Sequence, residues 1–230
     1  MNIVFDNSIC FGIFLTTGAY FLGLNVKKRW KLAIFNPLLM AILFVMVFLK
    51  ITDIHYEFYQ QNTQILSSLL TPATVCLAIP LYKQIHMLRK YRAAVAVGIT
   101  SGVMANAVSV FLLCRICKLN HEHYVTLLPK SITTAIGLGL SSEIGGITTL
   151  TVVCIIVTGI IGSMCAELFC RLFRITHPIA KGLAIGTCSH AIGTTKALEM
   201  GEIEGAMSSL SIAVAGLMTV IVVPMAAGWL

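Results

Sequence analysis

The sequence predicts an all-α integral membrane protein with about six full transmembrane helices and two short re-entrant or broken segments arranged as an inverted repeat. Composition, the spacing of charged residues and an internal repeat support this prediction. Of the 230 residues, 57% are hydrophobic and 11% are charged, and the mean hydropathy is +0.91. Soluble domains carry roughly 25% charged residues. We therefore expect a single membrane domain over residues 1–230, without a soluble module.

The remaining composition excludes several classes of function. The net charge of +7 does not indicate nucleic acid, because lysines and arginines beside transmembrane helices hold loops on the cytoplasmic side. Cys114 and Cys117 form an isolated C-x-x-C, which is weak evidence for a metal or redox site. No pattern of nucleophile, base and orienting group stands out. We expect neither an enzyme nor a bound metal or cofactor.

The predicted spans follow from the gaps between charges. Two uncharged runs, 131–142 and 182–195, hold twelve and fourteen residues. As straight helices they would reach only about 18–21 Å, too short for about 30 Å of hydrocarbon, and we interpret both as re-entrant or broken segments. Six runs have 18 residues or more and can cross: 7–26, 32–49, 58–82, 93–114, 144–166 and 205–230.

Basic clusters favour the same topology. The positive-inside rule places all three clusters in the cytoplasm only if 131–142 enters the membrane and returns on the same side. The alternative is eight ordinary crossings, in which the basic clusters follow the positive-inside rule only weakly. The clusters are Lys27, Lys28, Arg29 and Lys31; Lys83, Arg89, Lys90 and Arg92; and Arg171, Arg174 and Lys181.

An internal repeat links the two short segments. "AIGLGLSSEIGGI" at 135–147 and "AIGTTKALEMGEI" at 191–203 match at six of thirteen positions, and a long apolar run follows each copy. A unit of one re-entrant segment and one crossing contains an odd number of crossings, so its second copy is inverted relative to the first. We place the two units at approximately 124–175 and 180–230. Inverted repeats of interrupted segments build the substrate sites of many secondary transporters.

The first short segment contains a candidate anion site in "LLPKSITTAIG". Pro129 is expected to begin a helix, because proline suits the first helical position. Lys130, Ser131, Thr133 and Thr134 would then lie in its first turns, where free N–H groups attract anions such as a carboxylate. Alternatively, Lys130 is an interfacial lysine whose ammonium reaches the headgroups.

The second short segment, "GTCSHAIGTT", is too polar to face lipid. Such a stretch is tolerated at membrane depth only where it lines a protein-walled or watery cavity. His190 could also carry protons in coupled transport, or it could be a hydrogen-bonded core histidine. The candidate substrate-binding residues are Thr187, Ser189, His190 and Thr194 as donors, with Gly193 allowing close approach of another backbone.

Further polar positions have simpler interpretations beside the functional one. Glu143 and Glu199 recur in the repeat, and Pro72 aligns with Pro129 in a fainter third copy, so we consider Pro72, Glu143 and Glu199 as candidate pathway residues. The two glutamates could equally be the polar ends of short segments. Glu167 and Arg171 have the i,i+4 spacing of an ion pair on a helix surface.

A match that runs in order from about Asn36 to Pro224 resembles the LrgB/CidB family, with six signature stretches: "NPLLMAI", "LLTPATVCLAIPLYKQ", "LPKSITT", "EIGGI", "KGLAIGTCSHAIGTTKALE" and "EGAMSSL". The resemblance implies a multi-pass plasma-membrane protein tied to control of murein hydrolases and autolysis. It also implies a small holin-like LrgA/CidA protein as a separate partner chain. Related members, including a plastid branch, are understood to move pyruvate, glycolate or glycerate. The chain departs from the family at Ala135, where many members have proline, and at Cys188, where alanine is usual.

Two functions are compatible with these observations. The first is transport of small monocarboxylates of the pyruvate, glycolate and glycerate class. The second is a holin/antiholin-like regulator that acts by membrane assembly. Transport is favoured, because a pore made by oligomerisation does not need inverted interrupted segments. The expected partners are a small organic acid, the lipid bilayer, an LrgA/CidA-like chain and further copies of this chain.

Overall fold

The computed structural model describes residues 9–30, 35, 37–69, 72, 75–76, 79, 82 and 85–230. These residues form helices joined by turns, and the prediction of an all-α fold is confirmed for them. The chain divides into two compact units, Met1–Cys76 and Leu77–Leu230, which we call unit 1 and unit 2. Each unit is described separately, and the expectation of a single domain stays a prediction.

Unit 1 is built around a pair of long helices. Its helices are α1 (Ile9–Trp30), α2 (Pro37–Thr52), α3 (Tyr56–Asn62) and α4 (Gln64–Ser68). Ala19 of α1 packs with Ala41 and Val45 of α2 in a small apolar core. The run 58–82, expected as one span, passes through α3 and then α4, with Thr63 between them. Most of its remainder lies outside the described residues.

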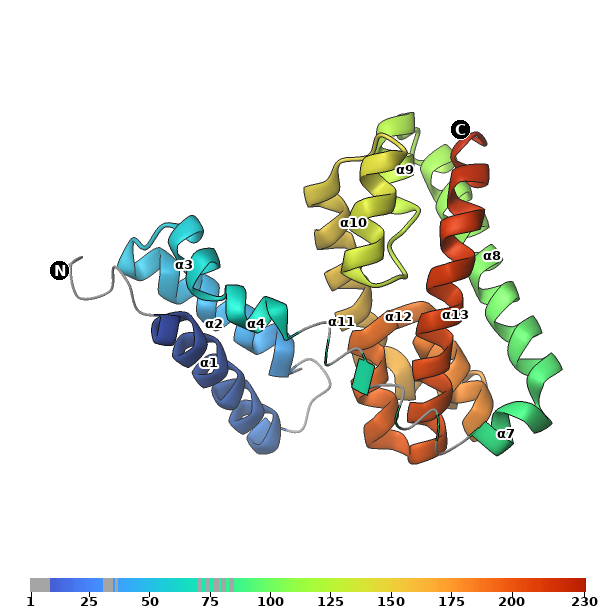
Figure 1. The fold of residues 1–230 in the computed structure, drawn as a ribbon, viewed down its shortest axis with the longest axis horizontal. Coiled ribbons are helices and arrows are strands. Elements are labelled where there is room, and N and C mark those ends of the chain that lie inside the picture. Colours follow the sequence, from blue (N-terminus) through green and yellow to red (C-terminus); the bar gives the residue numbers. More distant parts are fainter. Residues whose placement is uncertain are drawn as a thin grey trace. The chain divides into compact units, whose positions relative to one another are not determined.

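Unit 2 contains the segments on which the functional prediction rests (Figure 1). Three helices of the described residues, α8, α11 and α13, are long and apolar enough to cross a membrane. In unit 1, α2 is a shorter apolar helix of 16 residues. The count of six full crossings therefore stays a prediction. The helices of unit 2 are α7 (Ile85–Lys90), α8 (Arg92–Ile116), α9 (His121–Leu127), α10 (Thr134–Glu143), α11 (Thr148–Leu172), α12 (Pro178–Met200) and α13 (Glu202–Ala227).

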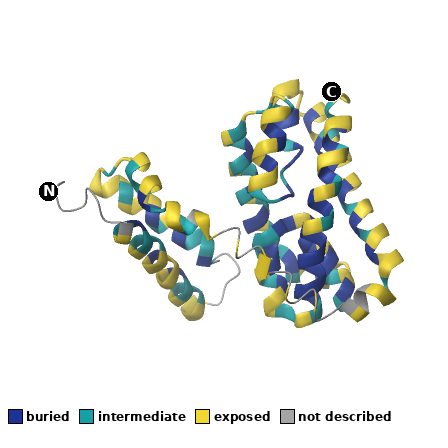
Figure 2. Cartoon of the chain, viewed as in Figure 1, coloured by how far each residue is buried: buried dark blue, intermediate teal, exposed yellow. Residues whose placement is uncertain are grey.

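The burial pattern of unit 2 suits a lipid environment. Buried residues gather where α12 packs on α13, and the outward side of α8 is largely exposed (Figure 2). The exposed residues on the long helices include large apolar side chains such as Val97, Leu113, Val153, Ile161 and Leu217. In water these side chains would be unfavourable, whereas lipid tails are as apolar as they are.

The first short segment folds back instead of crossing the unit. Its helix, α10, has only 10 residues. The Ile147 N–H, after α10, donates to Thr126 Oγ1 of α9 at 2.8 Å, so the chain enters and leaves at the same end of unit 2. Between these two points, Lys130 reaches Asn106 near the middle of α8. We call residues 121–147 the first hairpin.

The second short segment also folds back. Within α12, His190 has φ 42° and ψ −141°, which breaks the helix. A β-carbon at Gly193 would lie 3.1 Å from the Ile185 carbonyl oxygen, a contact that a straight helix cannot make between residues eight apart. Gly182 and Leu198, near the two ends of α12, both pack on the beginning of α13, at Glu204 and Gly205 respectively. We call residues 178–200 the second hairpin.

The hairpins enter unit 2 from opposite ends. Thr151, in the first turn of α11, donates through Oγ1 to the Thr126 carbonyl of the first hairpin at 3.0 Å. Lys196 of the second hairpin pairs with Glu167, near the last turn of α11, at 2.6 Å. Both short segments, 131–142 and 182–195, therefore turn back within unit 2, while their return to one face of a membrane and their inverted repeat stay predictions.

Two basic clusters lie at the same end of unit 2. The rings of Tyr91, beside Lys90 and Arg92, and His177, between Arg174 and Lys181, are 5.9 Å apart in a T-shaped contact. This agrees with the topology in which both clusters face the same side of a membrane. Lys31 and Lys83, from the predicted clusters, lie outside the described residues.

Thiol labelling should show this topology directly. In a background without native cysteines, Arg92→Cys and Arg174→Cys should react with an impermeant reagent from the same face of the cell membrane. Lys118→Cys, at the end of unit 2 that carries α9, should react from the opposite face, because α8 separates it from Arg92. Labelling of positions 92 and 174 from opposite faces would exclude two returning hairpins.

Candidate substrate-binding site

The first hairpin turns before its helix begins. Pro129 was expected to start that helix, and this prediction is wrong, because α10 begins at Thr134 with Thr133 as its N-cap residue. The Lys130 N–H donates to the Leu127 carbonyl at 3.2 Å, so the residues around Pro129 form tight turns. The fixed φ of proline suits such a turn as well as a helix start. Lys130 and Ser131 therefore precede the helix, while Thr134 is its first residue.

Lys130 is held at the tip of the first hairpin. Its Nζ donates to Asn106 Oδ1 of α8 at 2.6 Å, and Asn106 Nδ2 donates to the Leu128 carbonyl at 3.1 Å. The side chain of Lys130 is therefore fixed deep within unit 2 and does not extend toward headgroups. Asn106 was missed from the sequence, although it is the only asparagine in the uncharged run 93–114. A hydrogen bond from an ammonium is shorter and stronger than one between neutral groups.

His190 forms the tip of the second hairpin. Its imidazole Nε2 lies 2.9 Å from the Ile155 carbonyl oxygen of α11. Since a carbonyl only accepts, Nε2 carries the proton in this contact. A β-carbon at Gly159 would lie 2.7 Å from Nε2, so the glycine leaves room for the ring. Ser189 packs in the same way against Gly162. This geometry agrees with the alternative of a buried, hydrogen-bonded histidine, since His190 is 3% exposed.

Thr194 and Gly193 stabilise the turn of the second hairpin. Thr194 Oγ1 donates to the His190 carbonyl at 3.1 Å and lies 2.7 Å from Ser208 Oγ of α13. Gly193 lets its arm approach the other arm at Ile185. Both residues thus maintain the hairpin itself. Ser208 was not identified from the sequence, because it is one of several small residues in an apolar run.

Thr187 has a different environment from these paired groups. It is 7% exposed, and its Oγ1 has no hydrogen-bond partner among the residues that the structure describes. Its methyl group faces α8, because a β-carbon at Gly102 would lie 2.6 Å from Thr187 Cγ2. Leaving a buried hydroxyl unpaired costs about 1–3 kcal/mol, and a ligand that hydrogen-bonds to this hydroxyl would remove that cost.

The two tips meet at one segment of α11. Ile155 packs its side chain against Gly137 of the first hairpin, and its carbonyl accepts from His190 of the second. Lys130 and Thr187 both meet α8, at Asn106 and at Gly102, which are one turn apart on that helix. The structure therefore brings Lys130 close to the tip formed by Cys188, Ser189 and His190. An ammonium and an unpaired hydroxyl can bind a small anion. No three potential metal ligands gather within the described part of the chain.

Of the other sequence-predicted residues, Ser131 lies at this meeting point and the three pathway candidates lie away from it. Ser131 is buried beside Lys130. Glu143 ends α10 and is exposed, while Glu199 is exposed near the other end of unit 2 and pairs with Lys196 at 3.3 Å. Pro72 is exposed and belongs to unit 1. A role for these three in a pathway stays a prediction.

The predicted helix-surface ion pair is confirmed. Glu167 and Arg171 lie 3.5 Å apart on α11 with i,i+4 spacing. Both side chains are substantially exposed, at 44% and 83%. Exposed pairs of this kind contribute only about 0.3–0.5 kcal/mol to the free energy of unfolding, so this pair does not determine the fold.

The backbone at His190 yields a prediction about stability. His190→Gly should lower the melting temperature less than His190→Ala does. The free energy of unfolding should be about 1 kcal/mol or more higher in the glycine variant, because glycine adopts a positive φ without strain. Both variants lose the bond to the Ile155 carbonyl, so this loss cancels in the comparison. Thermal unfolding in detergent measures the difference.

The neighbouring residue provides a matched control. Ala191 follows the turn with helical geometry, and Ala191→Gly should destabilise the protein by about 0.5–1 kcal/mol. If His190→Gly proved less stable than His190→Ala, the turn at this residue would be disproved.

Comparison with known proteins places the chain in a family. The profile of the LrgB-like family matches residues 16–229. The chain belongs to the LrgB-like family. Within that family, it is 39% identical over 216 residues to the antiholin-like protein LrgB of Bacillus cereus strain B4264, with 94% of each chain covered. The same identity and coverage hold for the proteins of that name from Bacillus cereus strain AH187 and Bacillus anthracis strain A0248. No solved structure matches the chain.

The family resemblance seen in the sequence is thereby confirmed. Two of its stretches, "LPKSITT" at 128–134 and "KGLAIGTCSHAIGTTKALE" at 181–199, form the turn of the first hairpin and nearly all of the second. In this LrgB-like protein, two of the six stretches that carry the family resemblance thus belong to the hairpins that meet beside Ile155.

Proposed function

We propose that this LrgB-like protein transports small monocarboxylates of the pyruvate, glycolate and glycerate class across the plasma membrane as a multi-pass protein. The substrate would bind between the two hairpin tips. Its carboxylate would accept hydrogen bonds from Lys130, and Thr187 would supply a hydroxyl. Ser131 and the N-terminal N–H groups of α10 would add further donors.

The observation that carries this proposal is the meeting of two returning, polar hairpins beside Ile155. Gly137 of the first hairpin and His190 of the second contact Ile155 from the two sides. Polar, interrupted segments that enter from opposite sides and meet near the midplane are characteristic of secondary transporters. The units 124–175 and 180–230 would then form an inverted repeat, each made of one hairpin followed by one crossing.

The direct test is uptake into vesicles. The purified protein in proteoliposomes should accumulate radiolabelled pyruvate or glycolate faster than vesicles without protein. The uptake should saturate, and unlabelled substrate should compete. An uncharged analogue of similar size, such as lactamide, should not compete. Saturable uptake that does not distinguish the acid from the amide would contradict a carboxylate site.

A second candidate function comes from the names of the relatives, which are called antiholin-like proteins. In that function, the chain would regulate murein hydrolases and autolysis by assembling in the membrane with an LrgA/CidA-type partner or with further copies of itself. Repeating the uptake measurement with and without an LrgA-like chain separates the two. Transport by this chain alone supports the first function, whereas permeability that appears only with the partner supports the second.

A further inference from the structure

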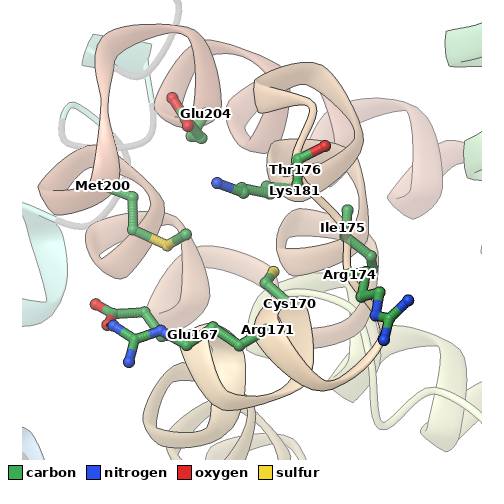
Figure 3. Close-up of a pocket in the computed structure, with 9 residues that line it drawn as sticks. All are labelled: Glu167, Cys170, Arg171, Arg174, Ile175, Thr176, Lys181, Met200 and Glu204. Carbon is green, nitrogen blue, oxygen red and sulfur yellow. The ribbon is translucent and has the colours of Figure 1, made fainter.

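A pocket of about 660 Å³ opens at the end of unit 2 that carries the end of α11. Its charged lining comes from α11, α12 and α13 and from the connection after α11, with Lys181 pointing into it (Figure 3). Met200, at the other end of α12, completes the wall. A ligand here would therefore contact both ends of the second hairpin. The charged lining residues are Glu167, Arg171, Arg174, Lys181 and Glu204.

The two carboxylates of the pocket have other roles. Glu167 accepts from Lys196 at 2.6 Å and from Arg171 at 3.5 Å. Glu204 is 9% exposed and its carboxylate folds back onto Gly201, at the N-terminus of α13, where the helix dipole favours negative charge. Neither Arg174 nor Lys181 forms a salt bridge with any residue that the structure describes. The pocket therefore presents positive charge to a ligand.

The same end of α11 also presents an apolar surface. Leu168 and Leu172 are 63% and 67% exposed, and Leu168 lies one turn before Arg171 on the same side of the helix. Large apolar side chains next to basic ones mark the boundary between acyl chains and headgroups. A free phosphate would use the cations alone, whereas a phospholipid would use both the cations and the apolar surface. Basic pockets between transmembrane helices bind anionic headgroups in this manner.

We propose that this pocket binds the phosphate of an anionic phospholipid, with Arg174 and Lys181 as its principal ligands. The acyl chains lie against the apolar face at the end of α11. Because Lys181 and Met200 belong to the two ends of α12, the bound headgroup stabilises the second hairpin against α11. This assignment does not depend on what the protein transports.

The test uses the full-length protein purified in detergent. Phosphatidylglycerol should raise its melting temperature in a saturable manner, and native mass spectrometry should show the lipid retained. Phosphatidylcholine, with a zwitterionic headgroup, and inorganic phosphate should have little effect. Arg174→Gln and Lys181→Gln should each raise the half-saturating concentration of phosphatidylglycerol about fivefold.

Lys118→Gln is a matched control for Arg174→Gln. Both residues follow a long helix with nearly equal positive φ, 52° and 53°. The residue after each donates to a helix carbonyl in the same pattern, Leu119 to Cys114 at 2.9 Å and Ile175 to Cys170 at 2.8 Å. Lys118 lies at the opposite end of unit 2, beside α9. Lys118→Gln should leave lipid binding unchanged.

Each contrary outcome overturns the assignment. Equal stabilisation by phosphatidylcholine would remove the role of headgroup charge, and full protection by inorganic phosphate would indicate a soluble anion instead of a lipid. An equal loss of affinity in Lys118→Gln would indicate general attraction between charges. If a pocket variant unfolds, two further variants preserve the test. Lys181→Arg keeps the charge and should retain phosphatidylglycerol, whereas Lys181→Met should lose it.

Discussion

Lys130→Gln should raise the half-saturating concentration for a transported monocarboxylate about 10- to 150-fold. A hydrogen bond from a charged group to a buried partner contributes about 1.5–3 kcal/mol, and each 1.4 kcal/mol is tenfold in affinity. Glutamine removes the charge but keeps an N–H donor that can face Asn106 Oδ1. Initial rates of labelled substrate uptake in proteoliposomes measure the change, with melting temperature as a check on folding.

Asn106→Ala separates the charge of Lys130 from its positioning. This variant removes the Oδ1 acceptor at 2.6 Å and the bond to the Leu128 carbonyl but keeps the ammonium. It should lower the melting temperature and weaken affinity less than Lys130→Gln does. Lys118→Gln, which removes a lysine distant from the hairpin tips, should transport as the wild type does. Unchanged affinity in Lys130→Gln would assign Lys130 a purely structural role between the hairpin turn and α8.

Gly186→Ala should destabilise the protein by about 1–3 kcal/mol and lower its melting temperature accordingly. Gly186 lies in the first arm of α12, in contact with the Ser208 carbonyl oxygen of α13. A β-carbon there would also lie 2.7 Å from Ser208 Cα, so the added methyl would meet backbone and not a flexible side chain. Relief of this clash requires α12 and α13 to separate. The Thr194–Ser208 hydrogen bond of 2.7 Å should weaken with it.

Gly139→Ala is the matched substitution in the first hairpin. A β-carbon at this position in α10 would meet nothing within 4 Å. The change should be neutral or stabilise the protein by about 0.4–1 kcal/mol, because alanine restricts the unfolded chain more than glycine does. Equal melting temperatures for the two variants would show that α12 and α13 do not pack at Gly186 and Ser208.

The fold-back of both hairpins could be predicted because it depends on properties local to the sequence. Twelve and fourteen uncharged residues cannot span hydrocarbon as a straight helix, wherever they lie in the protein. The basic cluster Arg171, Arg174 and Lys181 likewise indicated which end of 182–195 stays near water. The polarity of Thr187 to Thr194 required a lining of protein around it. The all-α fold class followed from these features, and the candidate site that they indicate stays a prediction.

The partners of the site residues could not be predicted in this way. Asn106 and Lys130 are 24 residues apart, and His190 is 35 residues from the carbonyl that it contacts. A carbonyl is present at every residue, so nothing in the sequence distinguishes Ile155. Pro129 was assigned to a helix start because its local preference is the same in a turn and at a helix N-terminus. Tertiary packing selected the turn.

The sequence by itself therefore determined that this protein is helical, rich in apolar spans, a member of the LrgB-like family and interrupted at two polar segments. Only the tertiary structure decided that the two interruptions meet at Ile155, that Thr187 stays unpaired among the described residues, and that Arg174 and Lys181 line one pocket. The physical reason is that the length, polarity and charge of a segment are properties of neighbouring residues and can be read from the sequence. Contact between distant side chains depends on how whole helices pack, and small residues such as Gly182 and Gly186 set that packing by how closely they let backbones approach.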